Sequence, residues 1–175
     1  LGFHNDLPNN IARPDWINIL CMRSHSENRV STSIINNQDI IDYLDEHTLN
    51  ILSQPIFVTP HEVISVHGGK GTEGIEEKPI YTKNSPVVFC YFEKRTQSIT
   101  DEGRAALVAL DDALHAVKQP VFLTPGCLMN IAYDQCLHAR EVIEIADHEQ
   151  HKTRWLQKAF NINSLEPFAS NMVDE

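Results

Sequence analysis

Residues 124–140 read TPGCLMNIAYDQCLHAR, in which two short β-type runs, residues 127–132 and 135–138, follow a Pro-Gly turn signal. Further runs rich in Val, Ile, Phe and Tyr, bounded by Pro, Gly or Asn, recur on the N-terminal side of this stretch. They are residues 18–23, 29–35, 55–59, 86–92 and 120–124. Short strands bounded by turn residues are typical of antiparallel sheets, so the sequence predicts a mainly β core.

Two segments have helical periodicity instead. Residues 38–53 carry an approximate apolar stripe, and residues 101–117 follow Thr100, a plausible N-cap, with acidic residues in the first turn. In the second segment the apolar residues recur at helical spacing: Ala106, Leu107, Leu110 and Leu114. Many strands with helices at the periphery, and no alternating strand-helix-strand units, predict a double-stranded β-helix, the jelly-roll or cupin-like fold.

The chain has 175 residues, of which 42% are hydrophobic, enough for one sizeable core and one domain. No internal repeat or domain boundary is evident. The chain opens with LGFHNDLPNN and has no initiator Met. We therefore expect residues 1–175 to form the C-terminal major part of a single jelly-roll domain, with an N-terminal portion absent.

The charge pattern limits the classes of partner. A net charge of −10 with only 14 Lys and Arg argues against nucleic-acid binding, which needs clustered cations. No apolar run approaches the roughly 18 residues of a membrane span, and no signal peptide is recognisable. The sequence predicts a cytoplasmic protein with a small-molecule partner and no membrane partner, and nothing in it favours an oligomer over a monomer.

Two other features predict no chemistry of their own. The four cysteines lack CxxC spacing and lie mostly in apolar runs, so we expect small buried side chains rather than a disulfide or zinc site. Residues 67–78 read HGGKGTEGIEEK, without apolar periodicity, and predict a loop. A lid over a site is one interpretation of this loop, and a solvated linker is favoured.

The triplet His4-Asn5-Asp6 is the first candidate for chemistry. Side chains at i and i+2 on an extended strand project to the same face and can bind one ion together. Two histidines and one carboxylate on one face of an octahedron are the ligand set suited to non-haem Fe(II), so a second histidine is needed from elsewhere. The triplet alone is weak evidence, because chance produces it often and a histidine near a chain end is usually exposed.

The order of the motifs along the chain resembles that of the clavaminate synthase-like (TauD-like) branch of the Fe(II)/2-oxoglutarate-dependent oxygenases. This branch includes hydroxylases of free arginine and lysine. The HxD triplet is followed by DWINILCMRS, RVSTSII and DYLDEHTLNILSQ, which are similar to a strand, a Thr-containing strand and a helix of that branch. TPGCLMNIAYDQCLHAR resembles the segment that ends in the family's HGR or HAR motif, and KTRWLQKAF resembles its RWL segment.

The resemblance implies a role for five residues. His4, Asp6 and His138 would ligate Fe(II), with 2-oxoglutarate and O₂ as cosubstrates. Arg154 would bind the C5 carboxylate of 2-oxoglutarate, a task suited to a planar guanidinium, and the Thr32 hydroxyl would contact the same carboxylate.

Three further residues are less closely matched. The spacing from His138 to Arg154 is slightly longer than in the family, so Arg140 is an alternative anchor for 2-oxoglutarate. Lys158 stands where arginine hydroxylases have an arginine that holds the α-carboxylate of the substrate. Glu93 lies near the region where those enzymes place acids that hold the basic end of the substrate, although a solvated charge is the favoured interpretation.

The function implied by the resemblance is hydroxylation of an unactivated C–H bond of a free basic L-amino acid, lysine before arginine, with succinate and CO₂ as coproducts. The carboxylate of Asp6 favours hydroxylation, because halogenating relatives have a small residue there. Two alternatives stay open at this point. One is a related oxygenase that acts on another or a carrier-bound amino acid, or that desaturates. The other is a cupin-like binding protein without turnover.

Overall fold

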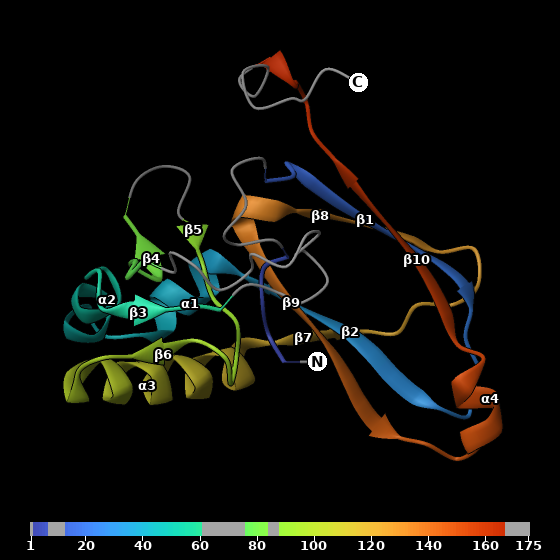
Figure 1. The fold of residues 1–175 in the computed structure, drawn as a ribbon. Coiled ribbons are helices and arrows are strands. Elements are labelled where there is room, and N and C mark those ends of the chain that lie inside the picture. The colour runs from blue at the N-terminus through green and yellow to red at the C-terminus, as the bar shows by residue number, and fades with distance from the viewer. Residues whose placement is uncertain (1, 7–12, 61–75, 84–87, 167–175) are drawn as a thin grey trace.

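Two three-stranded antiparallel sheets form the centre of the molecule (Figure 1). The computed structural model describes residues 2–6, 13–60, 76–83 and 88–166. The first sheet has the order β10-β1-β8, made of Trp155–Asn161, Trp16–Arg23 and Leu128–Ala132. The second has the order β7-β2-β9, made of Gln119–Val121, Arg29–Asn36 and Cys136–Glu144.

The two sheets pack face to face through alternate residues of their strands. In β1, Ile17, Ile19 and Cys21 are buried, whereas the residues between them are more exposed. These three side chains meet apolar side chains that include Ile34 of β2 and Val121 of β7. Because successive side chains of a strand point to opposite faces, this period of two creates one buried face per strand.

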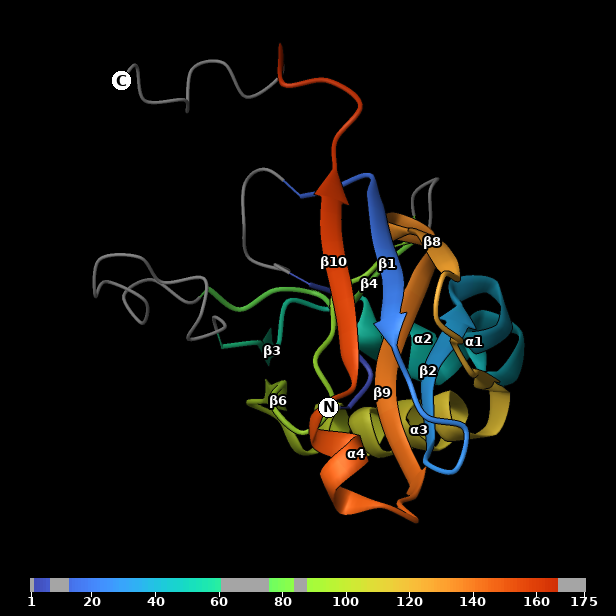
Figure 2. The same cartoon turned by 90° about the vertical axis from the view of Figure 1, so that its right-hand side faces the viewer.

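The other face of the second sheet is covered by helices. Ile35 of β2 and Leu137 of β9 belong to a second apolar core with Ile40, Leu52 and Leu110 of the helices. Figure 2 shows α1, α2 and α3 on the side of β2 and β9 that is away from β1 and β10. The bounds of the helices are Asn37–Tyr43 for α1, Glu46–Leu52 for α2, Asp101–Val117 for α3 and His148–Lys152 for α4.

Two short antiparallel pairs complete the described strands. Phe57–Val58 (β3) pairs with Gln97–Ser98 (β6), and Tyr81–Thr82 (β4) pairs with Val88–Phe89 (β5). Most of the predicted loop, residues 67–75, lies outside the described residues. Its last residue, Lys78, forms an isolated β-bridge with Phe57.

The predicted fold class is confirmed, and so are most of the predicted strands and the helix that follows Thr100. The Thr100 side chain accepts a hydrogen bond from the Gly103 N–H, as an N-cap does. The single helix predicted over residues 38–53 is wrong, because Leu44 has extended backbone, with ψ of 146°, and ends α1. Asp45 then begins α2 by accepting a hydrogen bond from the Thr48 N–H at 2.7 Å.

All four cysteines are free, as predicted. Their predicted burial is correct for Cys21 and wrong for Cys127, which is exposed, while Cys90 and Cys136 are half-buried. Among the residues that the structure describes, no helix is long and apolar enough to cross a membrane.

Truncation of Leu110 is expected to destabilise the protein by about 2–5 kcal/mol, because this α3 side chain is fully buried among the helices and the second sheet. Equilibrium unfolding of Leu110→Ala in urea measures the loss. Val108→Ala in the same helix is the matched control, since Val108 is 63% exposed and its truncation should change the free energy of unfolding by less than about 0.5 kcal/mol. Equal effects of the two substitutions would contradict the assigned core.

Candidate metal centre

The segment of residues 2–6 is held between β9 and the stretch that follows β5. The His4 N–H donates to the His138 carbonyl at 3.0 Å, and the His138 N–H donates to the His4 carbonyl at 3.2 Å. On the other side, the Asn5 N–H donates to the Tyr91 carbonyl at 3.1 Å. His4 and His138 are therefore directly opposite each other in an antiparallel pair, which brings their side chains to the same face.

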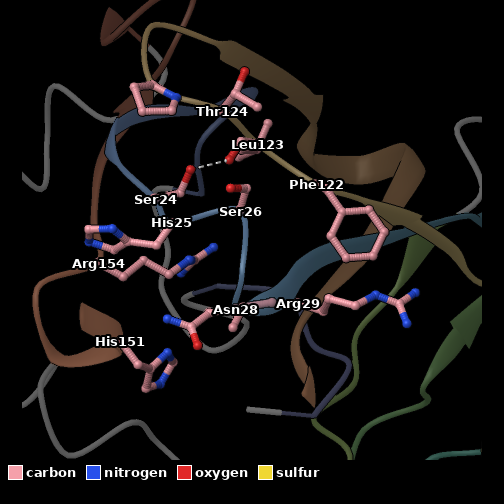
Figure 3. Close-up of a pocket in the computed structure, with 12 residues that line it drawn as sticks. Ser24, His25, Ser26, Asn28, Arg29, Phe122, Leu123, Thr124, His151 and Arg154 are labelled. Atoms are coloured by element: carbon pink, nitrogen blue, oxygen red, sulfur yellow. Dashed lines mark hydrogen bonds between the residues drawn. The ribbon is translucent and has the colours of Figure 1, made fainter. Parts of the chain in front are cut away.

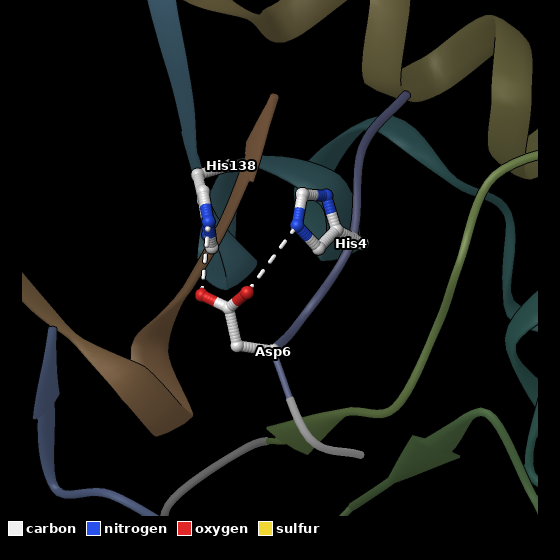
Figure 4. Close-up of side chains that lie close together, drawn as sticks. All are labelled: His4, Asp6 and His138. Carbon is white, nitrogen blue, oxygen red and sulfur yellow. Dashed lines mark ion pairs between the residues drawn. The ribbon is translucent and has the colours of Figure 1, made fainter. Parts of the chain in front are cut away.

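Asp6 completes a cluster with the two histidines (Figure 4). His138 Nε2 lies 3.2 Å from Asp6 Oδ2, and His4 Nε2 lies 3.6 Å from Asp6 Oδ1. One ligand atom from each residue lies within 4.8 Å of the other two, and all three residues are buried. Two ligands at right angles around one ion, with bonds of about 2.1 Å, would lie about 3 Å apart, so small shifts would close the cluster on a metal.

The two histidines have buried nitrogen atoms with unused hydrogen-bonding capacity. His4 Nε2 and His138 Nε2 both face the carboxylate of Asp6, at distances suited to an ion pair, but neither makes a well-directed hydrogen bond. A buried polar atom without a partner costs free energy, so such atoms are rare unless a ligand satisfies them. A divalent cation between the three side chains would satisfy both nitrogens and the carboxylate together.

Main-chain contacts orient the cluster. His4 Nδ1 lies 2.8 Å from the Gly2 carbonyl, which can only accept, so Nδ1 carries the proton and Nε2 is left as the ligand atom. The Tyr133 hydroxyl donates to the Asp6 carbonyl at 2.6 Å. Neither Gly2 nor Tyr133 was predicted from the sequence, because each acts at the main chain and belongs to no motif.

The charges of the cluster suit a cation. Burial raises the pKa of Asp6, but the facing imidazoles of His138 and His4 and the charge of Lys158 hold it well below its usual range. Burial lowers the pKa of His138, which favours the neutral imidazole that a metal requires. Lys158 of β10 places its ammonium 2.8 Å from both Asp6 oxygens.

Arg154 lies immediately before β10 and lines a cavity of about 510 Å³ (Figure 3). The cavity is lined by basic and polar side chains, including His25, Arg29 and His151, and by apolar ones such as Phe122 and Leu123. Within the described part of the chain, no acidic residue lines it. Burial lowers the pKa of the Arg154 guanidinium, and the charge of Arg140 lowers it further. These features suit an anion.

Known proteins resemble this chain in sequence and in fold. No protein-family model matches the chain. Over 167 residues it is 27% identical to clavaminate synthase 2 of Streptomyces clavuligerus, covering 91% of this chain and 49% of that protein. An asparagine oxygenase solved with Fe(II), 2S,3S-3-hydroxyasparagine and succinate superposes with a TM-score of 0.82 at 22% identity, over 95% of this chain and 51% of the other.

A second solved structure is also similar in fold to this chain. The non-haem iron oxygenase OrfP, solved with Fe, succinate and (3S)-hydroxy-L-Arg, has a TM-score of 0.79 at 14% identity, over 99% of this chain and 56% of the other. The chain has the fold of the iron oxygenases. It also resembles clavaminate synthase in sequence, and spans about half the length of these relatives.

Within this oxygenase fold, the predicted residues of the second sheet share the face of His138. Arg140 is paired with Thr32, two residues along from the pair of His138 and Ile34. Side chains two residues apart on a strand share a face, so Thr32 and Arg140 point to the same side as His138. Thr32 is buried, whereas Arg140 is exposed.

The cavity is separate from the cluster of His4, Asp6 and His138. None of His4, Asp6 and His138 lines the cavity. Arg154 immediately precedes β10, and Lys158 lies within this strand four residues further on, about 13 Å along an extended chain. Lys158 contacts Asp6 of the cluster, and Arg154 lines the cavity.

Glu93 is buried, whereas the favoured prediction for it was a solvated surface charge. It is 6% exposed, so its interpretation as a solvated charge is wrong. One carboxylate oxygen accepts a hydrogen bond from the Phe3 N–H at 2.7 Å, and the other lies 3.1 Å from His115 Nε2 of α3. The carboxylate thus lies against the main chain of the segment that carries His4.

Proposed function

We propose that this chain carries the metal centre of a non-haem Fe(II), 2-oxoglutarate-dependent oxygenase that hydroxylates a free amino acid. The observation that carries the proposal is the buried cluster of His4, Asp6 and His138, in which both histidine Nε2 atoms face one carboxylate without a hydrogen-bond partner. The fold shared with iron oxygenases and the sequence similarity to clavaminate synthase support it.

Two histidines and one carboxylate suit Fe(II), because they occupy one face of an octahedron and leave three positions for other ligands. When bound, the metal and its cosubstrate supply the activation of O₂ and the oxidation of an unactivated C–H bond, with succinate and CO₂ as coproducts. The protein contributes the positions and charges of the side chains that would hold the metal. His4 is fixed by its bond to the Gly2 carbonyl, and Asp6 supplies the single negative charge of the cluster.

Arg154 is the residue that we assign to the C5 carboxylate of 2-oxoglutarate. It is half-buried beside a cavity that no acidic residue of the described ranges lines, and burial of a guanidinium is costly unless an anion offsets it. Arg140 is exposed on its strand and fits the role less well. Thr32 is buried on the same face of the second sheet and supplies a hydroxyl.

Lys158 is assigned to the α-carboxylate of the amino acid. Its ammonium contacts both oxygens of Asp6, so a metal ion bound by Asp6 would compete with it for the same charge. A lysine displaced from Asp6 in this way stays beside the metal and can pair with another carboxylate. For the substrate we propose a basic amino acid, lysine before arginine, in keeping with the sequence resemblance. The similar structures have hydroxyasparagine and hydroxyarginine bound.

Anaerobic addition of Fe(II) and 2-oxoglutarate to the protein is expected to produce the visible metal-to-ligand charge-transfer band of the chelate. Zn(II) with 2-oxoglutarate is the matched control and should produce no band, because Zn(II) has a filled d shell and no accessible redox chemistry. Absence of the band with Fe(II) would argue for a cupin-like protein without turnover. Exposure to O₂ with a panel of free amino acids, followed by mass spectrometry for a +16 product, then identifies the substrate.

A further inference from the structure

Glu93 holds Phe3 by both its side chain and its main chain. Its Oε2 accepts the Phe3 N–H at 2.7 Å, and its own N–H donates to the Phe3 carbonyl at 2.8 Å. The residue is buried, and hydrogen bonds to a charged acceptor are roughly twice as strong as neutral ones. The segment that precedes His4 is therefore attached at two points to a single acidic residue.

The same peptide unit connects Glu93 to His4. The Phe3 N–H belongs to the peptide whose carbonyl is that of Gly2, and this carbonyl accepts the Nδ1–H of His4 at 2.8 Å. A carboxylate, a peptide and an imidazole are thus hydrogen-bonded in series. Groups in such a chain polarise one another, so negative charge at the N–H end strengthens the carbonyl as an acceptor.

The close fit at Gly2 shows that this contact is specific. A Cβ built at Gly2 would lie 2.5 Å from Glu93 Oε2 and 2.9 Å from Glu93 Cβ, so only glycine permits the approach. The second carboxylate oxygen is held by His115 of α3, at 3.1 Å from Nε2. Glu93, which lies in the turn between β5 and β6, therefore connects the segment that carries His4 to α3.

We propose that Glu93 is a positioning residue for the metal ligand His4, acting through the peptide between Gly2 and Phe3. It keeps the proton on Nδ1, directs Nε2 toward Asp6 and strengthens the imidazole as a ligand. Histidine ligands commonly donate their second nitrogen to a carboxylate or a carbonyl, and here one of each is used in series. The inference rests on the proposed function in that it takes His4 to be a metal ligand.

The test compares Glu93→Ala with Glu93→Gln. Alanine removes the acceptor for the Phe3 N–H, whereas the glutamine amide oxygen can still accept it. Fe(II) binding is titrated calorimetrically without O₂, and we expect affinity about tenfold or more weaker for Glu93→Ala, with most of the affinity kept by Glu93→Gln. In the metal-free protein, nitrogen NMR of His4 should show the Nδ1–H tautomer in the parent and a tautomer mixture in Glu93→Ala.

Two further variants separate positioning from general stability. Asp45→Ala removes the N-cap of α2 and should lower stability while leaving Fe(II) affinity unchanged. Gly2→Ala should displace the Glu93 carboxylate and weaken Fe(II) binding as Glu93→Ala does, which keeps the test available if Glu93→Ala does not fold.

The outcomes are distinct. Parent-like Fe(II) affinity and tautomer in Glu93→Ala would overturn the inference. So would normal Fe(II) affinity with a raised KM for the amino acid, because that result would assign Glu93 to the substrate. A parent protein that binds no Fe(II) would refute the proposed function, whereas a tautomer change in Glu93→Ala would still show that Glu93 orients His4.

Discussion

Replacement of Asp6 by glycine is expected to abolish hydroxylation and to weaken Fe(II) binding by more than about 100-fold, since loss of even an outer-shell contact costs about 10–100-fold. Asp6 is the one anionic member of the cluster, and its two oxygens face the two histidine Nε2 atoms. Without it, two neutral imidazoles must hold a divalent ion alone. Product formation and anaerobic Fe(II) titration measure the two losses.

The matched variant for this test is Asp6→Glu. It keeps the carboxylate on a side chain that is one methylene longer, so part of the Fe(II) affinity and of the activity should return. Asp6→Gly removes the ion pair with Lys158, whose ammonium lies 2.8 Å from each Asp6 oxygen, whereas the longer carboxylate of Asp6→Glu can still form it. Full activity of Asp6→Gly would refute the ligand assignment.

Replacement of Arg154 by glutamine is expected to raise the KM for 2-oxoglutarate by about 10- to 150-fold, the equivalent of losing a hydrogen-bonded charge pair worth about 1.5–3 kcal/mol. Arg154 is half-buried beside a cavity with no acidic lining residue in the described part of the chain. Arg154→Lys keeps the charge but loses the two-pronged geometry and should give an intermediate KM. Succinate release at varied 2-oxoglutarate concentrations provides the measurement.

Arg140→Gln is the control that separates the two candidate anchors. Arg140 is exposed and its charge acts on Arg154, so its replacement should change the KM for 2-oxoglutarate much less. A large KM increase for Arg140→Gln, with little change for Arg154→Gln, would exchange the two assignments. The KM for the amino acid should change less than that for 2-oxoglutarate in Arg154→Gln.

Much of the fold follows from local signals that depend on neighbouring residues. The β-type run of β1 and the N-cap at Thr100 are each visible within a few neighbouring residues of the sequence. Strand β1 and helix α3 both form where they were predicted. Strand β10 was not predicted, because most of its residues are exposed and its sequence has little alternation. It forms by pairing with β1, and the sequence of β10 does not indicate this distant partner. The break at Leu44 was missed because the apolar stripe continues across it.

The sequence by itself determined the types of the candidate ligands. His4 and Asp6 are two residues apart, which places their side chains on the same face of an extended segment. His138 lies in a motif that resembles the one that supplies the family's distal histidine. Only the tertiary structure decided that His4 and His138 are directly opposite each other, and that Glu93 is buried against the peptide before His4. The physical reason is that these tertiary contacts join residues 90 or more positions apart, whereas sequence patterns record local periodicity. Hence the three candidate ligands were predictable, and the residues that orient them were not.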